Sequence, residues 1–278
     1  MHNEIEDGGA KAIADSLQQS ALSTLDLRNN SLGVEGARHL AAALQHAGAL
    51  KTLDLGYGNS IGDEGAGALA EALKANNTLE TLDINGYESS QKIGRAGAQA
   101  IAEMLVVNRA LNTLNLSNNK IGAYDRDGDN VAPWIPTPGG PNTLFEALKE
   151  NTSLTALDFS KNHVDAAGAK GIAECIKANR ALASVNLLKN DLGDGAAAVV
   201  AAAKQQGNIK TLCGIEEGKD KASFRNNGLG APDAVLLSFD LEFNRELTCL
   251  DLSANNMDGA GRQAIRAAWK AKKSDLQL

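Results

Sequence analysis

The sequence predicts an α/β solenoid, in which repeated strand–helix units stack into one curved, right-handed body. A short apolar pattern, LxxLxL or a close variant, occurs eight times, and the last apolar residue is usually followed three positions later by asparagine. The undisturbed spacing between patterns is 28 residues, a period typical of stacked strand–helix repeats. The patterns begin at Leu22, Leu50, Leu79, Leu111, Leu154, Leu182, Ile209 and Leu247.

Each pattern predicts a short strand. In the first full unit, Leu25 and Leu27 alternate with the polar residues Asp26 and Arg28. Alternation with a period of two is expected of a strand that buries one face.

A helix is expected after each strand. Gly36, Ala37, Leu40, Ala41 and Leu44 recur at three- and four-residue spacing, so they share one helical face. Parallel strands lie about 4.8 Å apart, whereas helices pack about 8–10 Å apart. A stack with strands on one side and helices on the other must therefore curve, with the strands on the concave face.

Both ends of the chain continue the pattern. Residues 3–17 match the helical half of a unit, as either an N-terminal cap or part of a longer array, and residues 276–278 match the start of another strand. Because a repeat array has one continuous core, we expect a single domain over residues 1–278, with about eight repeats plus an N-terminal half-repeat.

Two units carry the full pattern, LSTLDLRNNSLGVEGARHLAAAL from Leu22 and LTALDFSKNHVDAAGAKGIAECI from Leu154. They resemble the ribonuclease-inhibitor-like class of leucine-rich repeats, which also occurs in nucleotide-binding immune receptors and in the Ran GTPase-activating protein. The resemblance covers nearly the whole chain and implies that the asparagine after each strand turns inward to satisfy backbone groups. These residues are Asn30, Asn59, Asn119, Asn162, Asn190, Asn227 and Asn255.

Composition and charge argue against several classes of protein. The net charge of −7 and the pI of about 5.2 do not fit a nucleic-acid-binding surface. No apolar stretch approaches the roughly 20 residues of a membrane span, and the acidic start does not resemble a signal peptide. Cys175, Cys213 and Cys249 have neither an even number nor CxxC spacing, so we expect reduced thiols in an intracellular, cytoplasmic protein.

No catalytic, cofactor-binding or metal-binding motif is evident. The four histidines are scattered and stand near no nucleophile motif. The segment GYGNSIG, at Gly56–Gly62, lacks the lysine and hydroxyl residue of a phosphate-binding loop. We therefore predict that the chain is not an enzyme and needs no cofactor.

Aromatic residues gather where three consecutive units are longer than the period. The extra residues number one near Tyr57, four around Tyr87 and fifteen between Gly122 and Gly140, all in strand-to-helix loops at one edge. Tyrosine and tryptophan are common at binding hot spots, so we predict a partner-binding aromatic ledge. The alternative is that these rings cover the core of their own loops. The ledge comprises Tyr57, Tyr87, Tyr124 and Trp134.

The longest of these loops carries Asp125, Asp127 and Asp129 at alternate positions, like the start of a calcium loop. An EF-hand would need glycine where Asn130 stands and glutamate where Pro136 stands. We predict a solvated acidic turn, and a weak calcium site completed by other loops is the alternative.

The seventh unit departs from the pattern in its strand. Ile209 and Leu212 start the strand, but Gly214 replaces the next leucine and about ten extra residues precede Phe224, which resumes the buried position. We predict a bulging charged loop near the concave rim that either contacts a partner or is a tolerated insertion.

An acidic row is predicted along the concave face. Its residues lie between the buried leucines of successive strands, where they could steer a basic partner. The alternative is that LDL is a common strand sequence of this repeat class. The row reads Asp26, Asp54, Asp83, Asn115, Asp158, Asn186 and Asp251, of which we assign Asp26, Asp54, Asp83 and Asp158 to partner binding.

These observations predict a non-catalytic protein–protein interaction module or scaffold, monomeric when isolated, with a protein partner of unknown identity. One alternative is a GTPase regulator resembling the Ran GTPase-activating protein. That family carries a long acidic C-terminal tail, whereas this chain ends in AWKAKKSDLQL. Another alternative is a structural subunit of a large assembly.

Overall fold

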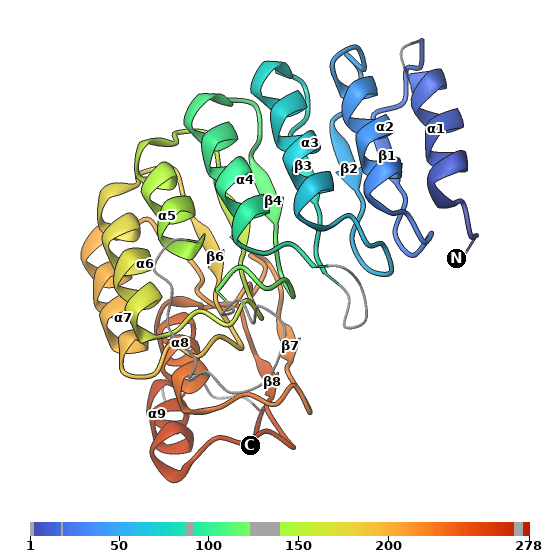
Figure 1. Ribbon diagram of the computed structural model, residues 1–278. Coiled ribbons are helices and arrows are strands. Elements are labelled where there is room, and N and C mark those ends of the chain that lie inside the picture. Colours follow the sequence, from blue (N-terminus) through green and yellow to red (C-terminus); the bar gives the residue numbers. More distant parts are fainter. Residues whose placement is uncertain (1–2, 18, 87–91, 123–139, 270–274) are drawn as a thin grey trace, which may run out of the picture.

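The computed structural model describes residues 3–17, 19–86, 92–122, 140–269 and 275–278. Helices lie along the outer side of a curved stack and short strands along its inner side (Figure 1), which confirms the predicted α/β solenoid. The helices are α1 (Glu6–Leu17), α2 (Val34–Leu44), α3 (Gly62–Ala75), α4 (Arg95–Val107), α5 (Gly140–Glu150), α6 (Ala166–Ala178), α7 (Gly195–Gln206), α8 (Ala231–Phe243) and α9 (Gly259–Trp269). The strands are β1 (Thr24–Asp26), β2 (Thr52–Asp54), β3 (Thr81–Asp83), β4 (Thr113–Asn115), β5 (Ala156–Asp158), β6 (Ser184–Asn186), β7 (Lys221–Ser223), β8 (Cys249–Asp251) and β9 (Asp275–Gln277).

Strands β1 to β6 form one parallel sheet in chain order. Their central residues pair in register, as Leu25 with Leu53, Leu53 with Leu82 and Leu82 with Leu114. The undisturbed repeat sets this register, because a one-residue slip would turn the buried side chains to the solvent face. Equivalent residues of successive units therefore lie side by side on the concave face.

The sheet is interrupted at the seventh unit. The run from Ile209 was expected to start a strand, but it contributes only a single bridge between Ser184 and Thr211, and the next strand begins at Lys221. Gly214 adopts a left-handed backbone with φ +70°, which ends the extended conformation. The remaining strands β7, β8 and β9 form a separate parallel sheet.

The apolar core runs along the whole stack. The expected helix face is confirmed in α2, where Ala37, Leu40, Ala41 and Leu44 are buried. The buried apolar residues of the described ranges, from Ala10 to Trp269, belong to one cluster.

The asparagines after the strands connect adjacent units as expected. Asn59 Nδ2 donates to the carbonyls of Leu27 and Leu55 at 2.9 Å each, and its Oδ1 accepts from the backbone N–H groups of Asn30 and Leu32. Five of these asparagines are buried, which fits the requirement that buried backbone groups find partners. They are Asn30, Asn59, Asn119, Asn162 and Asn190.

The prediction is wrong at Asn227, which is exposed. It follows β7, the first strand of the second sheet, so no neighbouring strand on that side offers it a carbonyl. Phe224 is also only half-buried, although it was expected to resume a buried position.

A second series of asparagines, which the sequence analysis missed, ends the helices. Asn108 Nδ2 donates to the carbonyls of Leu73 at 2.7 Å and Asn76 at 3.0 Å, and its Oδ1 accepts from the N–H groups of Ala110 and Leu111. In the sequence, each of these asparagines stands three positions before the first leucine of an LxxLxL pattern. The buried members are Asn76, Asn108, Asn151 and Asn179.

Candidate functional site

The acidic row is assembled by the register of the first sheet. Asp26 pairs with Asp54, and Asp54 with Asp83, at the ends of β1, β2 and β3. Farther along, Asn115 pairs with Asp158. The four predicted partner-binding aspartates therefore end β1, β2, β3 and β5, strands that lie on the inner side of the stack (Figure 1).

Each of these carboxylates is anchored by its own turn. One oxygen of Asp54 accepts the N–H of Gly56 at 3.0 Å, and one oxygen of Asp83 accepts the N–H of Asn85 at 2.9 Å. This bond recurs at Asp26 and Asp158. The turns therefore hold the carboxylates in similar orientations along the face.

The electrostatic environment changes along the row. Arg28 donates two hydrogen bonds to Asp26, which lowers the pKa of Asp26 to about 2. Burial and the neighbouring Asp83 raise the pKa of Asp54 to about 6, and Arg28 Nε lies 3.1 Å from Asp54 Oδ2. Burial also raises the pKa of Asp83. The row is thus neutralised by an arginine at its start and carries closely spaced, half-buried carboxylates in its middle.

Beyond β3, amides alternate with the carboxylates. Asn115 Nδ2 donates to Asp83 Oδ2 at 2.7 Å, and Asn186 Nδ2 donates to Asp158 Oδ2 at 2.9 Å. These four side chains line a shallow concave pocket of about 250 Å³ between β3 and β6. It is an acceptor-rich surface with no basic side chain in its lining.

The aromatic ledge is only partly covered by the described residues. Tyr57 lies in the turn between β2 and α3 and is 52% exposed, and its backbone N–H donates to Asn85 Oδ1 at 3.0 Å. Tyr87, Tyr124 and Trp134 lie outside the described residues, as do the three aspartates of the calcium-loop alternative. The ledge therefore stays a prediction, with Tyr57 as its described member.

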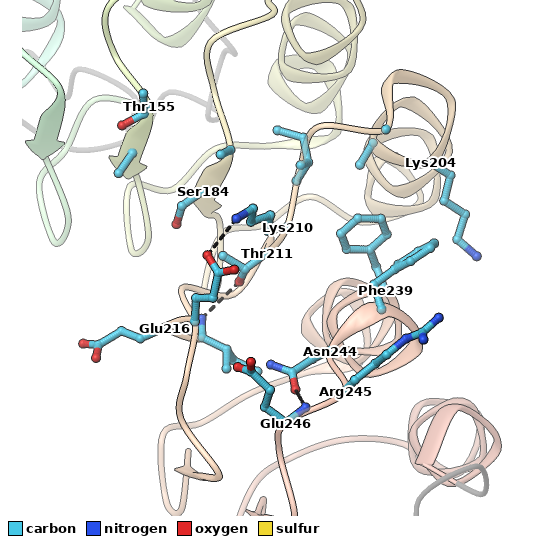
Figure 2. Close-up of a pocket in the computed structure, with 18 residues that line it drawn as sticks. Thr155, Ser184, Lys204, Lys210, Thr211, Glu216, Phe239, Asn244, Arg245 and Glu246 are labelled. Carbon is cyan, nitrogen blue, oxygen red and sulfur yellow. Dashed lines mark hydrogen bonds and ion pairs between the residues drawn. The ribbon is translucent and has the colours of Figure 1, made fainter.

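A larger pocket, of about 700 Å³, lies beside the interruption of the sheet. Figure 2 shows its side chains, which come from the ends of α7 and α8, from the segment around Thr211 and from the starts of β5 and β6, as at Thr155 and Ser184. Its apolar lining includes Ile209, Phe239 and Phe243. The sequence marks the irregular seventh unit but not this pocket, because the LxxLxL pattern does not show how α7 and α8 pack against each other.

Two further findings limit the chemistry of the described residues. In the ranges given above, no three His, Cys, Asp or Glu side chains gather closely enough to hold a metal ion. None of the helices in the described part of the chain has the length and apolar character of a membrane span.

The chain matches the family model for the leucine-rich repeat at residues 1–14, 20–41, 50–70, 107–123, 150–173 and 243–265. The longest unmatched range, residues 174–242, contains the interruption of the sheet. The human NACHT, LRR and PYD domains-containing protein 5 is 32% identical over 141 residues, which are 50% of this chain and 11% of that protein.

Solved structures with partial similarity include actin-binding site 2 of leiomodin-1, with a TM-score of 0.47 and 20% identity over 62% of this chain and 88% of that chain. The tropomodulin C-terminal domain from Caenorhabditis elegans has a TM-score of 0.42 and 12% identity over 71% and 93%. The LRIM1 leucine-rich repeat domain has a TM-score of 0.37 and 20% identity over 96% and 78%.

The repeating strand–helix units, the family model that matches them in six places and the human relative agree. The chain is a leucine-rich repeat protein.

Proposed function

We propose that this chain is a non-catalytic protein-binding module whose concave face binds a basic segment of a partner protein. Leucine-rich repeat proteins generally mediate protein–protein interactions. The observation that carries the proposal is the pair of adjacent, half-buried carboxylates of Asp54 and Asp83.

The balance of charge around this pair favours a cationic partner. Asp54 is flanked by Asp26 and Arg28 on one side and by Asp83 on the other. Arg28 is shared between Asp26, through two hydrogen bonds, and Asp54, through one ion pair. A lysine or arginine of a partner placed beside Asp54 and Asp83 would therefore reduce repulsion that the fold leaves in place, because an opposite charge at close range favours the ionised carboxylate.

Several finer features belong to the same proposal. We propose a single domain of the ribonuclease-inhibitor-like class, which is supported by the continuous core and by the helix of 11 to 14 residues in each unit. The free, buried thiols of Cys175 and Cys213 support a reducing, intracellular location. No observation on the described residues favours a GTPase regulator or a structural subunit over this function.

The proposal is tested with a fluorescein-labelled peptide of alternating arginine and alanine, and fluorescence anisotropy is the measurement. The variant Asp54→Asn with Asp83→Asn should bind this peptide roughly 2- to 30-fold more weakly than the wild type, because two ion pairs at about 0.2–1 kcal/mol each are lost.

The matched control is Glu71→Gln with Glu103→Gln, which removes the same charge from exposed positions on α3 and α4. It should bind like the wild type. Equal loss in both double variants would mean that net charge attracts the peptide, and the concave face would then not be the binding site.

A further inference from the structure

We propose that the 700 Å³ pocket between α7 and α8 is a second peptide-binding site, for a partner segment that carries a large apolar side chain beside a carboxylate. Ala156 and Ser184 line both this pocket and the one on the concave face, but Phe243, Asn244 and Arg245, which carry the inference, line only this one. The inference therefore stands independently of the concave-face proposal.

The pocket lies where, in the described part of the chain, the asparagine hydrogen bond between successive helix ends is missing. In preceding units, an amide of one unit reaches the carbonyls of the unit before it, as Asn179 Nδ2 reaches Leu148 at 2.6 Å. Gln206 continues the series by donating to the carbonyl of Asn179 at 2.8 Å. Asn244 holds the equivalent position after α8, but it bonds only within its own turn, to the N–H groups of Glu246 and Leu247.

The side-chain amide nitrogen of Asn244 consequently has no hydrogen-bond partner among the described residues. Asn244 lines the pocket, so this donor is available to a ligand there. It is a polar group that a peptide carbonyl or carboxylate could satisfy.

Helix α8 is instead attached to the seventh unit through Asp240. Its carboxylate accepts the N–H of Leu212 at 2.6 Å and the hydroxyl of Thr211 at 2.5 Å. This side chain occupies the place where a neighbouring strand would bond Leu212. This attachment lies one helical turn before Asn244, and the ion pair between Lys204 and Glu242 joins the C-terminal ends of α7 and α8.

The interior of the pocket is apolar. Ala203, Ile209 and Phe239 are buried beneath it, and the ring centroids of Phe239 and Phe243 lie 4.9 Å apart. Phe243 is nevertheless 49% exposed. The volume lies within the range of about 300–1,000 Å³ usual for ligand sites, so a large apolar side chain fits against Phe243.

The charged side chains of the lining include one basic group that can bind an acidic residue next to that apolar side chain. Lys204 is paired with Glu242 at 2.5 Å, and Lys210 with Glu217 at 2.7 Å. The remaining acidic groups, Glu216 and Glu246, also have partners.

Arg245 is the lining cation without a partner among the described residues. It directly follows Asn244, and Figure 2 shows both side chains beside the pocket. A guanidinium without a partner can bind a carboxylate with favourable geometry. The side-chain amide of Asn244 can donate to a carbonyl of the same peptide.

The probe for this site is a phage-displayed library of random peptides selected on the wild-type chain. We expect enriched sequences to combine a large apolar residue with a nearby Asp or Glu. Synthetic peptides of these sequences should bind Phe243→Ala about tenfold more weakly, as for an aromatic hot spot, and Arg245→Glu weaker by a similar factor. Binding to Asp54→Asn with Asp83→Asn should be unchanged.

The chain offers matched controls for both substitutions. Val107 precedes Asn108 as Phe243 precedes Asn244, and it is 53% exposed. Arg180 follows Asn179 as Arg245 follows Asn244. Val107→Ala and Arg180→Glu should bind the selected peptides like the wild type, and circular dichroism melting verifies that all variants fold.

Three outcomes would overturn the proposal. The first is the absence of enrichment over the bare support. The second is binding by selected peptides that Phe243→Ala and Arg245→Glu leave unchanged. The third is selection of basic peptides that lose affinity only for the Asp54 and Asp83 variant, which would assign peptide binding to the concave face.

Discussion

The first sheet and the second sheet differ in how they satisfy backbone groups between units. From β1 to β6, buried asparagines connect most units to a neighbour, as Asn59 connects Leu27 and Leu55. At the start of the second sheet, Asn227 is exposed, and Asp240 replaces a strand as the partner of Leu212. A regular region therefore presents a continuous charged face, whereas the break between regular regions opens a pocket.

This comparison predicts the largest effect at Asn162. Its side chain is fully buried and donates to the carbonyls of Leu116, Phe159 and Ser160. Asn162→Ala should lower the free energy of unfolding by about 3 kcal/mol, because several buried groups lose their partner.

The matched control is Asn227→Ala, which should change the free energy of unfolding by less than about 0.5 kcal/mol. Urea unfolding followed by circular dichroism measures both variants. Similar losses in the two variants would contradict the distinction between the two sheets.

Asp240 provides a pH-dependent test of the break. Burial raises the pKa of Asp240 to about 7. Since the folded-state pKa lies above the unfolded one, this group favours folding at low pH, and that contribution is lost as the pH rises from about 4 to about 7. Between about pH 5 and pH 7, the wild type should lose roughly 2 kcal/mol of stability more than Asp240→Asn does.

Urea unfolding across this pH range measures the difference between the two proteins. Because their other acidic groups are identical, the difference isolates Asp240. Parallel pH profiles would mean that this carboxyl does not titrate in that range.

Gly214 is expected to show a smaller effect. Its φ of +70° is unfavourable for other residues, and an added Cβ would lie 3.1 Å from Asn186 Nδ2. Gly214→Ala should therefore reduce the free energy of unfolding by about 1 kcal/mol. At Gly259 an added Cβ would meet no atom within 4 Å, so thermal melting of Gly259→Ala should match the wild type.

The solenoid and most of its register could be predicted because each unit repeats the same constraints. The positions of Leu25, Leu53 and Leu82 fix which face is buried, and an inward asparagine was correctly expected at Asn162. The asparagines that end the helices were equally regular in the sequence. They lie outside the strand pattern from which the fold was predicted, although Asn108 stands three residues before Leu111.

The sites were harder to predict because they depend on three-dimensional neighbours. The sequence places Asp54 and Asp83 in one row, but it does not show that Arg28 neutralises Asp26 and leaves the later carboxylates close together. The sequence likewise marks the irregular seventh unit. It does not show that Asn244 lacks the hydrogen bond to the preceding unit that Asn179 makes.

The smallest expected effect concerns the pH dependence of concave-face binding. Since the pKa of Asp54 is raised to about 6 by burial and by Asp83, protonation should weaken binding of the arginine–alanine peptide below this pH. Affinity should fall about 2- to 5-fold from about pH 7 to about pH 5, in line with the loss of one exposed ion pair. Asp54→Asn should flatten this dependence in an anisotropy titration, and an unchanged profile would assign it to other groups.

Hydrogen–deuterium exchange, with and without the saturating arginine–alanine peptide, tests the central claim most directly. The account predicts slower exchange at Leu55–Gly56 and Ile84–Asn85, the amides that follow the carboxylates of β2 and β3, with little change in β7 to β9. Slower exchange confined to the second sheet or to the outer helices would contradict the account and remove the acidic row as the binding surface.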